Sequence, residues 1–183
     1  LKKNGSLHKL KQITLTNSTF DGLIYNVERY MMEILAIKPD IIFHWDEAWF
    51  AFSHFSPVYH HRTAMTVAKL LEKRFKSDDY KHKYSKSKPG QLPDPEKVIL
   101  RVFSTQSTHK TLTSFRQGSM IHIYDNDFNE DLFLEAFRTH TSTSPNYQII
   151  ASLDIGRRQV ALEGYERVKN AIHLAHLLKE KIK

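Results

Sequence analysis

Apolar and polar positions along the chain predict four β-strands. Residues 11–16 alternate between polar and apolar side chains, which is the pattern of a strand with one buried face. Residues 41–44 and 98–103 are short apolar runs rich in β-branched and aromatic side chains, and residues 119–124 form a similar run. We therefore expect a β-sheet at the centre of the domain.

Two stretches between the predicted strands have the period of an amphipathic helix. Residues 23–36 place apolar side chains three or four positions apart, and Thr19 or Asp21 lies where a helix cap would be expected. This helix should end before Pro39, because proline disfavours helical backbone in the residue that precedes it. Residues 63–75 repeat the helical period and predict a second helix.

The order of the first elements favours a parallel sheet. A strand, a helix and a strand follow one another within residues 11–44, and strands connected in this way run parallel through a right-handed crossover. The length of 183 residues suits one domain. We predict an α/β fold with a mostly parallel sheet.

The second half of the chain combines a polar segment with further helices. Residues 77–95 are rich in Lys, Ser, Asp and Pro, and we expect a mobile insertion without order there. Residues 129–139 predict an amphipathic helix. Residues 147–162 and 165–182 predict two more helices, with Gly164 as the break between them. The side chains expected to face inward from residues 129–139 are Leu132, Phe133, Ala136 and Phe137.

Composition excludes several classes of protein. A hydrophobic content of 40% supports a packed core, and the chain has no cysteine for disulfides or thiolate metal ligands. None of the 11 histidines forms a helical pair with a carboxylate at zinc spacing, so we predict no metal site. The chain also lacks an apolar run long enough to predict a membrane span. It starts at Leu1 without an apolar leader, which we interpret as an internal start of an intracellular, cytoplasmic protein.

The formal net charge of +7 comes mainly from one segment. Residues 69–101 contain ten Lys and Arg residues against five Asp and Glu residues, which leaves +5 of the +7. Basic segments attract phosphate backbones without specificity, but few aromatic side chains accompany these charges for base stacking. We therefore predict no specific nucleic-acid binding.

Polar side chains follow two of the predicted strands directly, at the position where α/β proteins bind ligands. Ser107, Thr108 and Lys110 come after the third strand; hydroxyls can hold a phosphate, and a desolvated lysine amine can attack an aldehyde. Asp46 follows the second strand, and a carboxylate there can pair with a protonated ring nitrogen. An aspartate and a lysine in this arrangement are typical of a pyridoxal phosphate site.

A purely structural interpretation is open for the same residues. The chain has eighteen lysines, and most lysines in proteins are solvated surface residues. On this interpretation Lys110 is a surface residue, Asp46 caps a helix and Trp49 fills the core.

Several motifs in register resemble one enzyme family. They are DEAWF at 46–50, SPVY at 56–59, QSTHK at 106–110 and HTSTSPNY at 140–147, with TNSTFDG at 16–22 and RQGSMIH at 116–122 in support. In this order they resemble the major domain of the bacterial ornithine/lysine/arginine decarboxylases, which are pyridoxal-phosphate enzymes of aspartate-aminotransferase-like fold. The resemblance covers about residues 14–183.

The resemblance implies a fold and a place within a longer chain. It implies a three-layer α/β/α sandwich in which residues 1–183 form part of the cofactor-binding major domain, with the C-terminal helices leading toward a further domain. Family members are several times longer, and the turn that binds the cofactor phosphate and the ring that stacks on the cofactor would precede Leu1. We therefore expect this polypeptide to be part of a larger enzyme and inactive by itself.

The resemblance also implies roles for the residues after the strands. Lys110 would bind pyridoxal 5'-phosphate covalently, and Asp46 would keep the ring nitrogen protonated, since a nearby anion raises the pKa of a base. Ala48 would pack under the ring. Ser107 and His109 would lie near the phosphate.

Three further residues have more than one interpretation. Thr143 and Ser144 would bind the cofactor, through a contact across a dimer interface, although Ser144 equally suits a role as a helix N-cap. Trp49 would contact the substrate or fill the core. An active site shared in this way would require a homodimer or a higher homo-oligomer.

The activity implied is decarboxylation of a basic amino acid, arginine, lysine or ornithine, to the corresponding amine and CO2. An aminotransferase reaction on the same scaffold is an alternative, because fold does not determine the reaction. A non-catalytic polypeptide whose basic segment binds an acidic partner is a second alternative.

Overall fold

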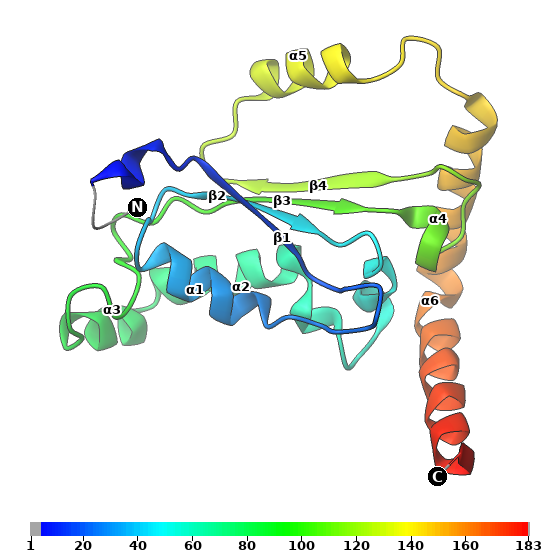
Figure 1. The fold of residues 1–183 in the computed structure, drawn as a ribbon, viewed down its shortest axis with the longest axis horizontal. Helices are drawn as coiled ribbons and strands as arrows, with labels where there is room; N and C mark the ends of the chain where they lie inside the picture. The colour runs from blue at the N-terminus through cyan, green and yellow to red at the C-terminus, as the bar shows by residue number, and fades with distance from the viewer. Residues whose placement is uncertain (1–4, 183) are drawn as a thin grey trace.

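A four-stranded sheet organises the molecule (Figure 1). The computed structural model describes residues 5–182. β1 (Gln12–Thr16), β2 (Ile42–Asp46) and β3 (Arg101–Gln106) are parallel neighbours, and β4 (Met120–Asp125) pairs with β3 in antiparallel orientation. All four predicted strands are therefore confirmed, and so is the mostly parallel α/β fold.

The core lies between one face of the sheet and two helices. α1 (Val27–Leu35) and α2 (Ala64–Lys76) cover this face, and Phe43 and Trp45 of β2 are buried beneath them. Burying side chains of this size contributes on the order of 1.5–3 kcal/mol each. Both helices agree with the sequence predictions in type and approximate position.

The start of α1 differs from the prediction. We expected Thr19 or Asp21 to cap this helix, but the Asn26 side chain accepts the capping hydrogen bond from the backbone N–H of Arg29 at 3.2 Å. Residues 17–25 instead fold back on themselves through a bridge between Ser18 and Ile24. Gly22 permits this turn because its φ of +85° is a conformation that side chains disfavour.

The polar segment 77–95 contains a helix, so the expectation of an unordered insertion was wrong. α3 (Asp78–Ser85) begins after Ser77, whose side chain accepts from the backbone N–H of Tyr80. Tyr80 is only 5% exposed, and its hydroxyl donates to the carbonyl of Pro93 at 3.0 Å. Burial raises the pKa of Tyr80 to about 12. One buried aromatic residue therefore anchors a segment whose composition is otherwise polar.

Short helical turns connect the larger elements. Three are 3-10 helices, and the fourth, α4, follows β3 directly. The turns are η1 (Ser6–Lys9), η2 (Ala51–Phe55), η3 (His60–Arg62) and α4 (Thr108–Thr111).

The helix after β4 is present but its apolar face is not covered. α5 (Glu130–His140) starts at the Asn129 cap, and Leu132 and Phe137 are 63% and 48% exposed. The prediction that these side chains point into a core was therefore wrong within residues 5–182. In Figure 1 the helix stands away from the sheet, on the side opposite α1 and α2.

The C-terminal region forms one helix instead of the two that we predicted. α6 (Tyr147–Ile182) runs through Gly164 without a break, and Gly164 is buried. A Cβ atom at Gly164 would lie 2.8 Å from the Phe55 ring, and one at Gly156 would lie 1.8 Å from the carbonyl oxygen of Thr113. Both glycines therefore allow close approach, and their role is contact with η2 and with the chain after α4.

Replacing Gly156 with alanine should destabilise the protein that carries this chain. Alanine favours a helix by about 1 kcal/mol over glycine, but its Cβ would collide with a backbone carbonyl that cannot rotate away. We expect a net loss of roughly 1–3 kcal/mol in urea unfolding. Leu162→Ala, at an 87% exposed position of the same helix, is the matched control. Equal stability of the two variants would contradict the contact.

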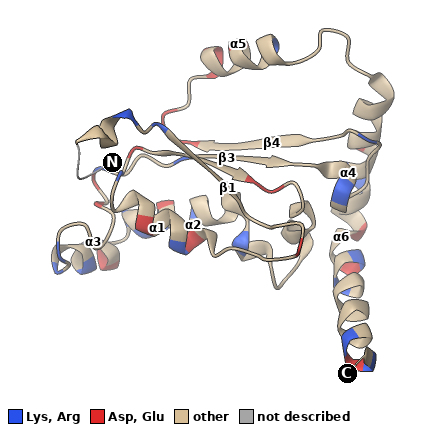
Figure 2. Cartoon of the chain, viewed as in Figure 1, with Lys and Arg blue, Asp and Glu red and all other residues tan. Residues whose placement is uncertain are grey.

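The charge is distributed unevenly along the molecule. The basic segment runs from α2, beneath the sheet, to α3, at the end of the sheet opposite α4 (Figures 1 and 2). Most of its positive charge therefore lies away from the strand ends that carry the predicted chemistry. Within residues 5–182, no helix has the length and apolar character needed to cross a membrane.

Candidate active site

The carboxyl ends of the three parallel strands meet at one edge of the sheet. Thr16 pairs with Asp46, and Asp46 pairs with Thr105, so β1 and β2 end side by side and β3 ends one residue further on, at Gln106. The segment with Ala48 and Trp49 leaves β2 at this edge, and the segment that leads to Lys110 leaves β3 beside it. Residues predicted from distant parts of the sequence therefore reach the same end of the sheet.

The Asp46 carboxylate is half-buried and has one hydrogen bond to its own loop. Its Oδ1 atom accepts from the backbone N–H of Ala48 at 3.0 Å, which fixes the carboxylate and holds Ala48 next to it. No donor among residues 5–182 hydrogen-bonds to the second oxygen, Oδ2. Asp46 therefore presents an oriented carboxylate with an oxygen available to a ligand, and it does not cap a long helix.

The Lys110 amine lies over an aromatic ring. Its Nζ atom is 4.8 Å from the centroid of Trp49, and the Trp49 ring in turn makes an edge contact with Phe20 at 5.2 Å. This cation–π contact joins the loop after β2 to the one after β3. Trp49 is 37% exposed, so it contributes to the surface around Lys110 and not to the core.

Ser107 and His109 occupy the turn between β3 and Lys110. Ser107 precedes α4 but makes no side-chain capping bond, so its hydroxyl is not committed to the helix. His109 Nδ1 lies 2.8 Å from the carbonyl oxygen of Gly118, which orients the imidazole and leaves Nε2 on the other side of the ring. Both side chains are half-buried near the strand edge.

Thr143 and Ser144 are not brought to this edge by any hydrogen bond within residues 5–182. They lie in the exposed loop between α5 and α6 (Figure 1). The alternative role of Ser144 as a helix cap is wrong, because the Asn146 side chain accepts from the backbone N–H of Ile149 and caps α6.

Sequence reasoning missed the most connected side chain of the region, Glu47. It is fully buried, and its carboxylate accepts four hydrogen bonds of 2.7–2.9 Å. Side chains alternate between the faces of an extended chain, so Glu47 points to the helix side of the sheet and Asp46 to the other side. The donors are Asn17 Nδ2, the backbone N–H of Ala64, Ser104 Oγ and Gln106 Nε2.

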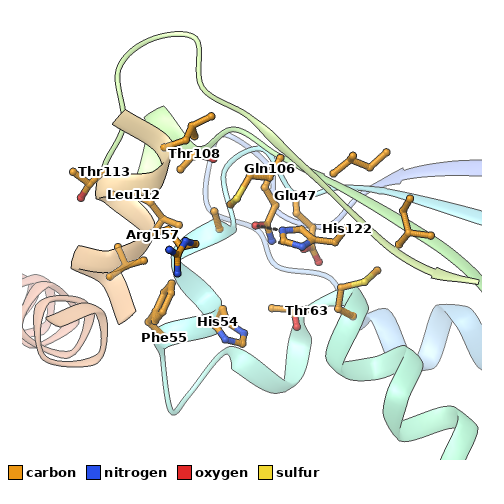
Figure 3. A pocket seen from close by; sticks show the side chains of 18 of the residues that line it. Glu47, His54, Phe55, Thr63, Gln106, Thr108, Leu112, Thr113, His122 and Arg157 are labelled. Atoms are coloured by element: carbon orange, nitrogen blue, oxygen red, sulfur yellow. Dashed lines mark hydrogen bonds between the residues drawn. The ribbon is translucent and has the colours of Figure 1, made fainter. Parts of the chain in front are cut away.

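A pocket of about 600 Å³ opens beside Glu47 on the helix side of the sheet (Figure 3). Gln106 and His122 line it from the sheet, His54 from η2 and Arg157 from α6. Neither Asp46 nor Lys110 belongs to its lining. The pocket therefore borders the same strand ends, through Gln106 and Thr108, but does not include the predicted catalytic pair.

His122 links this pocket to the carboxylate. Its Nε2 atom lies 3.1 Å from Gln106 Oε1, and the amide nitrogen of Gln106 donates to Glu47. Burial lowers the pKa of His122, the charge of Glu47 opposes this change, and His54 adds to it. The imidazole is therefore neutral at neutral pH and donates through Nε2.

The lowered pKa of His122 predicts a loss of stability in acid. Below the unfolded pKa of about 6.5 the unfolded chain binds a proton that the folded chain resists, so the free energy of unfolding falls as pH decreases. His122→Gln keeps a donor for Gln106 but does not titrate. We expect its melting temperature to fall less than that of the unsubstituted protein between about pH 7 and pH 5. Parallel pH curves for the two proteins would contradict this assignment.

The sheet, together with Asp46 and Lys110 at its edge, indicates the class of protein to which the chain belongs. The mostly parallel sheet, with Asp46 at the end of β2 and Lys110 after β3, agrees with the fold-type-I large domain that the sequence resemblance implied. Comparisons with known proteins agree: the family model described as Orn/Lys/Arg decarboxylase, major domain, matches residues 2–87 and 86–183. The chain therefore belongs to the Orn/Lys/Arg decarboxylase family.

The names of individual relatives describe them as decarboxylases of basic amino acids. A lysine decarboxylase of Pseudomonas aeruginosa is 39% identical over 150 residues, which are 80% of this chain and 16% of that protein. The biodegradative arginine decarboxylase of Escherichia coli is 31% identical over 157 residues, covering 85% of this chain and 17% of that protein. The crystal structure of a Francisella novicida lysine decarboxylase gives a TM-score of 0.67 at 33% identity, covering 93% of this chain and 19% of that one. This chain thus spans less than a fifth of each relative's length.

Proposed function

We propose that this chain carries the lysine-containing part of a pyridoxal-phosphate site in an enzyme that decarboxylates a basic amino acid. Family membership supports the reaction class, and the pairing of β2 with β3 supports the site, because it brings the Asp46 and Lys110 segments to one edge. When bound, pyridoxal phosphate supplies an electron sink that stabilises negative charge on the substrate's α-carbon.

The side chains at this edge suit the chemical groups of the cofactor. The Lys110 amine faces an aromatic ring and forms no ion pair within residues 5–182, so it is available to an aldehyde. The available oxygen of Asp46 suits a protonated ring nitrogen, and the Ser107 hydroxyl suits a phosphate. In this proposal Ala48 lies under the ring and His109 near the phosphate.

The substrate is a basic amino acid in this proposal. Lysine and ornithine decarboxylases are both among the relatives, and the choice between these two substrates, which differ by one methylene, is worth only about 1–3 kcal/mol. Trp49, half-exposed beside Lys110, is the proposed substrate contact from this chain. The exposed loop with Thr143 and Ser144 is the proposed contact with the cofactor of a second subunit in a homo-oligomer.

Covalent capture tests the proposal directly. The protein that carries this chain would be incubated with pyridoxal 5'-phosphate, reduced with borohydride and digested for peptide mass mapping. The expected result is a pyridoxyl group on Lys110 alone. Label spread over many of the eighteen lysines would mean that no specific site forms, and the proposal would fail. Release of CO2 from lysine, arginine or ornithine then identifies the substrate.

A further inference from the structure

Glu47 connects more of the site's framework than any residue predicted from the sequence. Its Oε1 accepts from Asn17 Nδ2 at 2.8 Å, at the end of β1, and from the backbone N–H of Ala64 at 2.7 Å, at the start of α2. Its Oε2 accepts from Ser104 Oγ at 2.8 Å and from Gln106 Nε2 at 2.9 Å, both in β3. One carboxylate therefore joins three strand ends and a helix.

All four hydrogen-bond partners of Glu47 are donors, so this position requires a side chain that presents only acceptors. An ionised carboxylate presents only acceptors, and the N-terminus of α2 adds a favourable dipole for a negative charge. An amide at this position would direct an N–H group toward two existing donors. Glu47 is fully buried, so water cannot replace the lost bonds easily.

The residues that this carboxylate holds are neighbours of the proposed catalytic pair. Asp46 is adjacent to Glu47 in the chain, and its carbonyl accepts from the backbone N–H of Asn17 at 2.9 Å. Gln106 is the last residue of β3, immediately before the turn that carries Ser107 and Lys110. Movement at Glu47 would therefore change where Asp46 and the Lys110 turn leave the sheet.

We propose that Glu47 is a positioning residue: its buried carboxylate fixes the carboxyl ends of β1, β2 and β3 and so sets the placement of Asp46 relative to Lys110. Glu47 itself points to the face of the sheet opposite Asp46, and its four hydrogen bonds within residues 5–182 go to other residues than Asp46 and Lys110. This role rests on the proposed function for its effect on the cofactor, but the fixing of the strand ends is independent of that function.

The test compares variants of the protein that carries this chain. Glu47→Gln keeps the size of the side chain and removes the charge, and Ser104→Ala removes a single donor as a milder change. Leu35→Ala, a fully buried position in α1 away from the strand ends, is the control for general loss of stability. Three quantities are measured: hydrogen exchange of peptides covering 104–112, dissociation of pyridoxal 5'-phosphate, and the pH midpoint of the absorbance of the bound cofactor.

In Glu47→Gln, exchange over 104–112 should become about tenfold faster or more, because a hydrogen bond to a charged group is lost. The dissociation constant of pyridoxal 5'-phosphate should rise by a similar factor, and the pH midpoint of the cofactor absorbance should shift. Ser104→Ala should show the same changes at smaller size, and Leu35→Ala should show none beyond a lower melting temperature.

Two results would contradict the positioning role and the proposed function separately. If Glu47→Gln matches Leu35→Ala in all three measurements, the carboxylate contributes only stability and the positioning role is wrong. If the unsubstituted protein captures no cofactor on Lys110, the proposed function is wrong. Hydrogen exchange without cofactor still decides whether Glu47 fixes the strand ends.

Discussion

Replacing Lys110 with alanine is expected to abolish specific capture of pyridoxal 5'-phosphate and to reduce decarboxylation by at least about 10²–10⁴-fold, the range for removing one positioned acid–base group. The loss follows because the amine is the only nucleophile proposed at this edge. Stability should change little, since Lys110 is exposed and its contact with Trp49 is worth about 0.5–1 kcal/mol at such a site. Turnover, borohydride capture and melting temperature measure these effects.

Lys83→Ala is the matched control for this experiment. Lys83 is an exposed lysine of α3, at the end of the sheet remote from α4 (Figure 1). Its substitution should leave both capture and turnover unchanged. Full activity in Lys110→Ala would exclude Lys110 as the residue that binds the cofactor.

Replacing Asp46 with asparagine should lower activity by roughly tenfold to hundredfold without unfolding the protein. Asparagine keeps an oxygen for the backbone N–H of Ala48, so the loop after β2 should keep its conformation. The substitution removes the negative charge proposed to hold a proton on the ring nitrogen, and a charge-assisted hydrogen bond contributes about 1.5–3 kcal/mol. The decrease should appear in kcat, because the proton on the cofactor's ring nitrogen is needed most when negative charge develops on the substrate's α-carbon.

Asp40→Asn provides the comparison within the same region of sequence. Asp40 precedes the opposite end of β2, and its hydrogen bond with Lys38 lowers the pKa of its carboxyl. This surface change should leave kcat unaltered, whereas Asp46→Asn should also move the absorbance of the bound cofactor. An unchanged kcat in Asp46→Asn would remove Asp46 from the site.

The strands were predictable because their signal is local. β2 and β3 contain compact apolar runs, and a βαβ order determines parallel pairing almost independently of detail. The alignment of Asp46 with the end of β3 follows from that pairing. Placement of the two segments at one edge was therefore within reach of the sequence.

Glu47 was not predictable in the same way. Its side-chain partners Asn17, Ser104 and Gln106 lie 30, 57 and 59 positions away in the chain, and no local pattern connects them. Two adjacent acids also look equivalent in sequence, although strand alternation sends them to opposite faces. Reading alternation through the end of the strand would have suggested that one of the pair is buried.

The errors in the helices have a common origin. The low helix propensity of glycine predicts a helix break at Gly164, but in α6 this residue provides space for the Phe55 ring. The average polarity of segment 77–95 predicts no order, but Tyr80 anchors the segment through its burial and its bond to Pro93. In both places a single tertiary contact overrides the local propensity.

The separation of the strands along the chain also sets an order of assembly. β3 and β4 are close in sequence and can pair early, whereas the bonds of Glu47 to β3 must close loops of 57 and 59 residues. The edge that carries Asp46 and Lys110 can form only after these long-range contacts exist. The catalytic geometry should therefore be among the last features acquired during folding, and a nascent chain should bind no cofactor until β3 has joined β2.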